Sequence, residues 1–433
     1  MRSRLRVILI LGGLLAGCGG DDTATTTTAA PTTTQATTTA APVTTTAALT
    51  TTSTALEGPG LTWTRADREG VLAGPGLQMV LSMVVGGPGL VAVGSEESEG
   101  DADAAVWLSV DGHTWTQAPH DADTLGGLGI QMMYSVAVGG PGLVAVGVDD
   151  PDGSPEEGLV DADAAVWVSA DGYTWTRIPH DEAVFGGPEG QRMMDVTAGG
   201  PGLVAIGSDY QDGSTWPDGA VWVSADGFTW TRVDDPAVFG GHGGQEILSV
   251  TAGGPGVVAV GSGESYSNAA VWVSEDGYSW SRIPNNAAVF GGASEMSRVM
   301  VAGPGLVAVG GSTGGSDHVM VWVSVDGYAW TRIEDGADLN GSGSLSVHAA
   351  ALWRGGLALV GKDESSDQTA VVFWLSADGY RWDRISPDQA VFGNADDLEI
   401  AALAGWGTGL VLLVGDVSSD DWNGAVWVTP PPG

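Results

Sequence analysis

The chain has 433 residues and a formal net charge of −38 at pH 7, because 53 acidic residues outnumber 15 lysines and arginines. This charge repels phosphate groups, so we expect no nucleic acid among its partners. The single cysteine, Cys18, excludes a disulfide within the chain. The sequence has 69 glycines, no helical apolar patterning and many β-branched residues, which together predict an all-β fold.

The first 17 residues have the pattern of a secretory signal, with three arginines ahead of an apolar run at residues 7–15. The run leads into Leu15-Ala-Gly-Cys18, which closely resembles the lipobox of bacterial lipoproteins. The resemblance implies cleavage before Cys18, lipidation of that residue, and anchoring of the chain on the outer side of the bacterial cell membrane. An ordinary cleaved signal peptide is the alternative.

Residues 18–58 contain this cysteine and then almost only Thr, Ala and Pro. No periodic apolar pattern could bury a core there, so we predict a disordered tether. Residues 59–433 carry a repeated pattern instead, and we predict that they form one closed array.

One motif, Trp-x-Ser-x-Asp-Gly-x-x-Trp, occurs six times in this array, at residues 107–115, 167–175, 222–230, 272–280, 322–330 and 374–382. Asp-Gly between two runs of strand-forming residues predicts a β-hairpin. If the turn has two residues, the two indoles of each copy point to opposite faces. A second motif, Gly-Gly-Pro-Gly followed by an apolar run, has seven full or degenerate copies.

Successive copies are 50–60 residues apart, which is the length of one β-propeller blade. Within a blade we predict four strands, as at residues 247–252, 257–261, 269–274 and 278–283. The last copy stops after its third strand, and Leu61-Thr-Trp-Thr-Arg65 matches the missing fourth strand. We therefore predict a seven-bladed β-propeller of four-stranded blades, closed by an N-terminal strand that completes the last blade.

The hairpin motif resembles the Asp-box (BNR) hairpin of sialidase-like propellers, and the resemblance covers nearly all of residues 60–429. All six full copies lack one residue that the family pattern has between Asp and Gly. The resemblance implies a folding element remote from the catalytic face, so we predict that the motif aspartates are structural. They are Asp111, Asp171, Asp226, Asp276, Asp326 and Asp378.

We expect any ligand on the opposite face. A sialidase would need an arginine cluster there, for which Arg192 and Arg298 are candidates. They stand at different distances from the glycine motif, so we assign no catalytic residue. Glutamines at the start of the first strand of four blades form a second candidate ligand face. They are Gln78, Gln131, Gln191 and Gln245.

The loops between the second and third strands are acidic, and clustered carboxylates can bind calcium. The weak metal candidates are Asp101, Asp103, Asp161 and Asp163. No stretch has the spacing of an EF-hand loop, so we favour a solvated acidic rim and expect no cofactor.

These features together predict a non-enzymatic, monomeric, extracytoplasmic lipoprotein whose propeller binds or scaffolds a protein or glycan. A sialidase-like glycoside hydrolase and a calcium-dependent adhesion module are the alternatives.

Overall fold

The computed structural model describes residues 61–67, 72, 77–98, 101–154, 159, 161–187, 189–210, 216–241, 243–263, 268–312, 318–334, 339, 344–366, 368–416 and 423–429. The predicted signal segment, Cys18 and the tether of residues 18–58 lie outside these residues. So do parts of the acidic loops.

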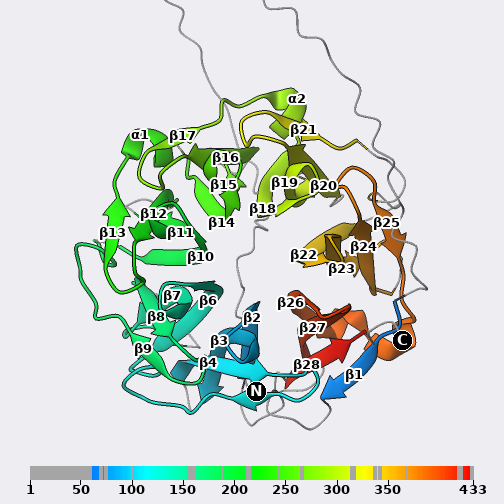
Figure 1. Ribbon diagram of the computed structural model, residues 1–433, viewed down its shortest axis with the longest axis horizontal. Coiled ribbons are helices and arrows are strands. Elements are labelled where there is room, and N and C mark those ends of the chain that lie inside the picture. The colour runs from blue at the N-terminus through cyan, green and yellow to red at the C-terminus, as the bar shows by residue number, and fades with distance from the viewer. Residues whose placement is uncertain are drawn as a thin grey trace, which may run out of the picture.

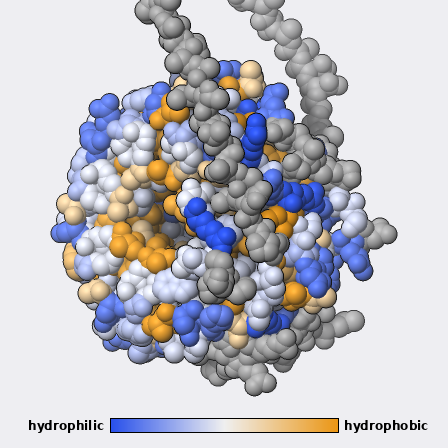
Figure 2. All heavy atoms as spheres, turned by 45° about the vertical axis from the view of Figure 1, so that its right-hand side comes forward, coloured by the Kyte–Doolittle hydropathy of each residue, from blue (hydrophilic) through white to orange (hydrophobic). Residues whose placement is uncertain are grey.

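Seven blades of four antiparallel strands form a ring (Figure 1), and a space-filling view shows that the ring has a central channel (Figure 2). A single parallel bridge between Ala102 and Ile130 joins blades 1 and 2 into one eight-stranded sheet. The blades consist of β2 (Leu77–Gly86), β3 (Gly89–Ser98), β4 (Asp101–Ser109) and β5 (Thr116–Gln117) in blade 1; β6 (Ile130–Gly139), β7 (Gly142–Asp150), β8 (Asp163–Ser169) and β9 (Trp175–Arg177) in blade 2; β10 (Gln191–Gly199), β11 (Gly202–Asp209), β12 (Asp218–Ser224) and β13 (Trp230–Val233) in blade 3; β14 (Glu246–Gly253), β15 (Gly256–Ser262), β16 (Ala269–Ser274) and β17 (Trp280–Arg282) in blade 4; β18 (Ala293–Ala302), β19 (Gly305–Ser312), β20 (Val319–Ser324) and β21 (Trp330–Arg332) in blade 5; β22 (Leu345–Trp353), β23 (Gly356–Asp363), β24 (Ala370–Ser376) and β25 (Asp383–Ile385) in blade 6; and β26 (Leu398–Trp406), β27 (Gly409–Asp416), β28 (Asn423–Val428) and β1 (Thr64–Asp67) in blade 7.

The first strand of each blade is innermost, and the chain then moves outward strand by strand (Figure 1). Single-turn helices lie in the connections between blades: α1 (Pro236–Phe239), α2 (Ala287–Phe290), α4 (Gln389–Phe392) and the 3-10 helix η3 (Ala395–Asp397). Across the described ranges, we find no helix with the length and apolar character that crossing a membrane requires.

The apolar core lies between the blades, because the two middle strands of each blade are covered on both faces. All six residues of β16 are buried, for example, as continuous apolar runs predict. The connection between blades adds a large side chain to the interface, as Phe239 does between blades 3 and 4. The indole Nε1 of Trp272 donates to the carbonyl oxygen of Val238 in the same connection, at 3.2 Å. The equivalent indoles of Trp167, Trp222, Trp322 and Trp427 make the same kind of bond and tie their blades to the preceding ones.

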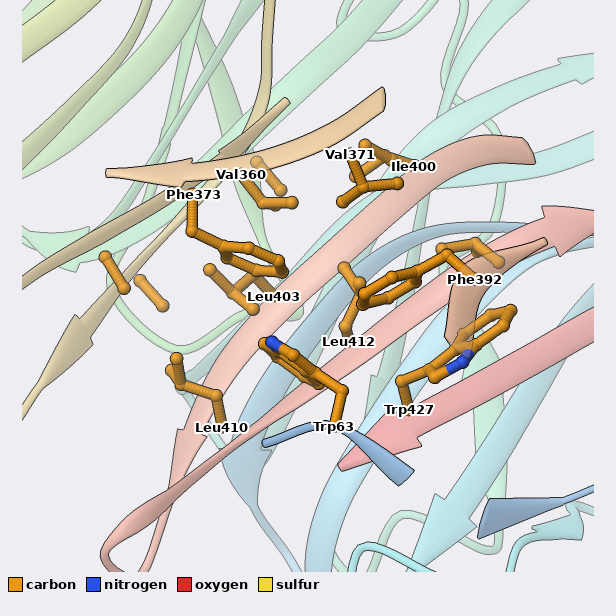
Figure 3. Close-up of a cluster of buried hydrophobic side chains, with 14 of the residues drawn as sticks. Trp63, Val360, Val371, Phe373, Phe392, Ile400, Leu403, Leu410, Leu412 and Trp427 are labelled. Atoms are coloured by element: carbon orange, nitrogen blue, oxygen red, sulfur yellow. The ribbon is translucent and has the colours of Figure 1, made fainter. Parts of the chain in front are cut away.

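The ring closes through β1, which pairs with β28 so that Thr64 lies opposite Val428. Just before β1, the buried indole of Trp63 stacks on the ring of Phe373 in blade 6, with the centroids 4.7 Å apart. Figure 3 shows this indole inside the apolar cluster that blades 6 and 7 share. Another buried cluster joins blade 7 to blade 1. The predicted seven-bladed propeller and its closure by an N-terminal strand are confirmed.

The hairpin between the third and fourth strands differs from the predicted two-residue turn. In blade 2, Ser169 pairs with Trp175, so residues 170–174 form a five-residue loop. Directly paired residues share a face of the sheet, and Trp167 lies two residues before Ser169. Both indoles therefore point to the same side and enter the cluster between blades 1 and 2. The prediction of opposite faces was wrong.

Side-chain hydrogen bonds explain the wider loop. Oδ1 of Asp171 accepts the backbone N–H groups of Thr174 and Tyr173, each at 2.8 Å, and Oγ of Ser169 accepts that of Gly172 at 2.8 Å. The two bonds from Thr174 and Tyr173 hold the pKa of Asp171 below its usual value. In this loop only Gly172 has a positive φ, of 82°. A two-residue type I′ turn would need two such residues in succession.

Candidate ligand site at the channel mouth

A β-bulge near the start of each innermost strand aligns one residue position of every blade. In β10 the register shifts between Met193 and Asp195, and the other six innermost strands shift at the equivalent place. Bulges bend a strand and re-aim its side chains, and they recur at ligand sites. In each innermost strand, one residue pairs last before the bulge, and the residue preceding it takes the equivalent position in every blade. From blade 1 to blade 7, the residues at this position are Met79, Met132, Arg192, Glu246, Glu295, Ser346 and Glu399.

These residues surround the end of the channel at which the innermost strands begin, which we call the channel mouth. Figure 2 shows the ring hollowed at its centre, with hydrophobic residues on part of the wall. Blades 1 and 2 supply methionines to the mouth, whereas the other blades supply charged or polar side chains. The mouth is therefore apolar on one side and polar on the other.

The acidic part of the mouth comes from blades 4 and 5. Burial raises the pKa of Glu246, against the effect of the Arg192 guanidinium. Burial, together with the negative charge of Glu246, raises the pKa of Glu295 to about 7, while Arg298 opposes the rise. Both carboxyl groups therefore hold a proton more tightly than an exposed glutamate does.

The cationic part of the mouth comes from blades 5 and 6. Burial and the positive charges of Lys362 and Arg298 lower the pKa of His348 to about 4, so its imidazole is neutral at pH 7. The Nε2 atom of His348 lies 2.9 Å from the hydroxyl oxygen of Ser346. Lys362 pairs in register with Ser346 and is only 8% exposed.

The charges of the mouth are close enough to influence one another, yet they do not form ion pairs. In the part of the chain that the structure describes, no oppositely charged group lies within 4.0 Å of Arg192, Glu246, Glu295, Arg298 or Lys362. Burying charge without a partner is unfavourable. A bound molecule with both donors and acceptors would therefore be stabilised here.

Two tyrosines complete the wall beside Arg192. The guanidinium carbon of Arg192 lies 5.2 Å from the centre of the Tyr210 ring. Burial raises the pKa of Tyr210 and that of Tyr134, although Arg192 opposes both shifts. A tyrosine nucleophile would need the opposite shift, because only the ionised phenol attacks well.

A belt of hydrogen bonds below the mouth holds three blades in place. Oδ1 of Asp195 in blade 3 accepts the hydroxyl of Ser135 in blade 2 at 2.7 Å. Its Oδ2 accepts the hydroxyl of Ser249 and the backbone N–H of Val250, both in blade 4, at 3.1 and 2.9 Å. These bonds fix the relative positions of the blades that carry Tyr134, Arg192 and Glu246.

The four predicted glutamines lie inside the blades and are between 0% and 2% exposed. Nε2 of Gln131 donates to Oδ1 of Asp149 at 2.9 Å and to the carbonyl oxygen of Leu128 at 2.8 Å. Nε2 of Gln191 donates to Oδ1 of Asp209 at 2.8 Å, and Gln245 donates to the carbonyl oxygen of Gly240. The amides attach loops to strands, so Gln78, Gln131, Gln191 and Gln245 do not present the surface ring that the sequence suggested.

The two predicted arginines do reach the mouth, at different levels. Arg192 pairs with Ser208 before the bulge of β10, whereas Arg298 pairs with Val309 after the bulge of β18. Sequence reasoning missed the other mouth residues, namely Tyr134, Tyr210, Glu246, Glu295, His348 and Lys362. For the residues in first strands, the one signal was a polar residue in a mostly apolar run, as with Glu246 directly after Gln245. Lys362 lies near the end of a second strand and Tyr210 directly follows one, and neither gave such a signal.

The motif aspartates lie at the other end of the blades, in the loops between the third and fourth strands. Each accepts two backbone N–H groups of its own loop through Oδ1. They are Asp111, Asp171, Asp226, Asp276, Asp326 and Asp378.

The four candidate calcium ligands do not form one cluster in the described residues. Asp103 of blade 1 lies 3.5 Å from Nε2 of His120, and Asp163 of blade 2 lies 3.6 Å from Nε2 of His180. Of the four aspartates, only Asp163 belongs to a group of three or more converging metal-binding side chains. Asp101 and Asp161 stand outside that group.

The fold and the mouth define a class: a seven-bladed β-propeller with a polar site at one end of its channel. No protein-family model and no curated protein sequence matches the chain.

Solved structures resemble it at low identity. A protein of unknown function from Dyadobacter fermentans is 13% identical, covers 86% of this chain and 99% of its own, and has a TM-score of 0.47. The Trypanosoma rangeli sialidase is 14% identical over 84% of this chain and 55% of its own, with a TM-score of 0.43. The endosialidase of phage phi92 is 11% identical over 86% and 70%, with a TM-score of 0.46. At this identity the likeness concerns the fold and transfers no activity.

Proposed function

We propose that the chain is a non-enzymatic, monomeric, extracytoplasmic lipoprotein whose propeller binds an acidic glycan at the channel mouth. One observation carries this proposal. Lys362 is a buried cation without an acidic partner among the described residues, in a chain whose net charge is −38. A carboxylate or sulfate of the ligand would supply the missing negative charge.

The rest of the mouth suits a sugar. Arg192, Glu246 and Glu295 offer donors and acceptors for hydroxyl groups. An acidic peptide would also supply anions for the cations and backbone N–H donors for the glutamates, so both kinds of probe are tested.

Two features favour binding over turnover. The pKa of Tyr210 is raised by burial, which opposes its use as a nucleophile, and Arg192 and Arg298 stand at different levels of the mouth. A glycoside hydrolase is the second candidate because of the carboxyl pair. Glu295, with a pKa of about 7, would suit a general acid, and Glu246 would be the second carboxyl group of the pair.

Binding of defined probes to the purified full chain tests the proposal. The probes are oligosaccharides that carry uronic or sialic acid, their carboxyl-reduced neutral counterparts, and acidic peptides of the same charge. We expect the acidic oligosaccharides to bind and Lys362→Met to weaken them at least about tenfold. Arg381→Met removes one positive charge from an exposed turn of the same blade and should change nothing.

Equal binding of the neutral counterparts, or full binding by Lys362→Met, would overturn the assignment of the site. Preference for the peptides would replace the glycan with a protein partner. Release of sugar by the wild type that is lost in Glu295→Gln would replace the binding role with hydrolysis.

The anchor has a separate test. Cys18→Ser removes the predicted lipidation site, so the variant should leave the membrane fraction while the wild type stays in it. Retention of the variant on the membrane would contradict a lipid anchor at Cys18.

A further inference from the structure

Three side chains of blade 2 converge at the outer edge of the propeller, apart from the channel mouth. Asp163 begins β8, and His180 and Glu182 lie in the connection that follows β9. Nε2 of His180 is 3.6 Å from Oδ2 of Asp163 and 3.2 Å from Oε2 of Glu182. One donor atom from each side chain lies within 4.8 Å of the other two.

These distances match the edges of a metal coordination polyhedron. In a tetrahedral zinc site with bonds of 2.0–2.2 Å, neighbouring ligand atoms are about 3.3 Å apart. One imidazole with two carboxylates is a donor set for zinc and similar transition metals. Calcium takes oxygen ligands, and six to eight of them.

The charge around the site also favours a dication. The carboxylates of Asp163, Glu182, Asp161 and Asp150 interact electrostatically here, and His180 is the one basic side chain that acts on Asp163. A divalent ion would neutralise more of this negative charge than one imidazole can.

Blade 1 repeats the arrangement with one donor fewer. Asp103 and His120 approach to 3.5 Å, much as Asp163 and His180 do. The residue two positions after the histidine is Ala122 in blade 1 and Glu182 in blade 2. The chain therefore contains its own control, a two-donor pair beside a three-donor group.

We propose that Asp163, His180 and Glu182 bind one divalent transition metal ion of the zinc type, with a coordination position left for water or another ligand. The site is independent of glycan binding at the channel mouth. Its residues are accessible: the side chains of His180 and Glu182 are 43% and 73% exposed.

Metal titration of the untagged full chain, freed of metal with a chelator, tests the proposal. Zinc is added in competition with a chromophoric chelator, and the absorption spectrum of bound Co²⁺ reports the coordination number. We expect one zinc ion per chain, and binding more than about tenfold weaker in His180→Ala and Glu182→Ala. The Ala122→Glu variant, which completes the donor set of blade 1, should bind two ions.

Because these side chains are exposed, the variants should unfold at the wild-type denaturant concentration without metal, which excludes misfolding as the cause. No zinc binding by the wild type, or wild-type binding by both His180→Ala and Glu182→Ala, would overturn the site. Equal competition by Ca²⁺ would overturn the choice of metal. A single ion in Ala122→Glu would count against this donor set.

Discussion

Replacing Glu295 with Gln tests the electrostatics of the channel mouth. Burial and the charge of Glu246 raise the pKa of Glu295 from 4.5 to about 7, so the folded chain keeps a proton there that the unfolded chain releases above pH 4.5. A carboxyl group whose pKa is raised on folding stabilises the fold fully at pH values below its pKa in the unfolded chain. This stabilisation is lost as the pH rises through its pKa in the folded chain, here about 7. At 1.36 kcal/mol for each tenfold change in proton affinity, the loss is about 3 kcal/mol.

Glutamine resembles the protonated carboxyl group and does not ionise. We therefore expect Glu295→Gln to match the wild type near pH 4.5 and to be more stable by up to about 3 kcal/mol at pH 8. Denaturant unfolding from pH 4.5 to 8.5 at constant ionic strength would show two curves that diverge with pH. Glu399→Gln removes the same charge from the equivalent, exposed position of blade 7, so its curve should run parallel to the wild type. A parallel curve for Glu295→Gln would refute the reasoning.

Three further predictions concern closure, the belt and acid stability. Trp63→Ala should lower the free energy of unfolding by about 3–5 kcal/mol, because the indole is 4% exposed and stacked on Phe373. As a control, Phe228→Ala replaces a turn residue that is 50% exposed and should change the free energy of unfolding by less than about 1 kcal/mol. Asp195→Ala leaves donors of the two neighbouring blades unpaired and should lose about 2–4 kcal/mol. Asp195→Asn, with one acceptor oxygen, should lose less, and equal losses would contradict the belt. His348→Gln should lose less stability than the wild type as the pH falls from 6.5 to 4, because a lowered histidine pKa stabilises the fold above 6.5 and that contribution disappears in acid. The same pH titration measures it, and parallel curves would argue against a buried neutral imidazole.

The candidate site shows where sequence reasoning stops. The glutamines at the start of the first strand were visible as a repeat and were taken for a ligand face, yet the fold buries all of them. The residues that do face the mouth, such as Glu295, His348 and Lys362, do not repeat from blade to blade. Nothing in the local sequence of each residue says which charges of other blades lie beside it.

The hairpin loop shows a different limit. Asp-Gly correctly indicated a turn, but the dipeptide alone does not reveal that Ser169 and Asp171 accept the loop amides and widen the turn to five residues. That difference in loop length reverses the relation between the two indoles, because one added residue in the register moves a side chain to the other face.

The sequence by itself determined the class of fold, the number of blades and the way the ring closes. These follow from local patterns, since each blade repeats its own strand and turn signals and Leu61-Thr-Trp63 repeats the missing fourth strand. Only the tertiary structure decided which side chains meet at the mouth and in the group of Asp163, His180 and Glu182. The contacts at the mouth join residues from different blades, and those of Asp163 reach a connection that follows the next strand. Their chemistry depends on burial and charge that exist only once the ring has closed.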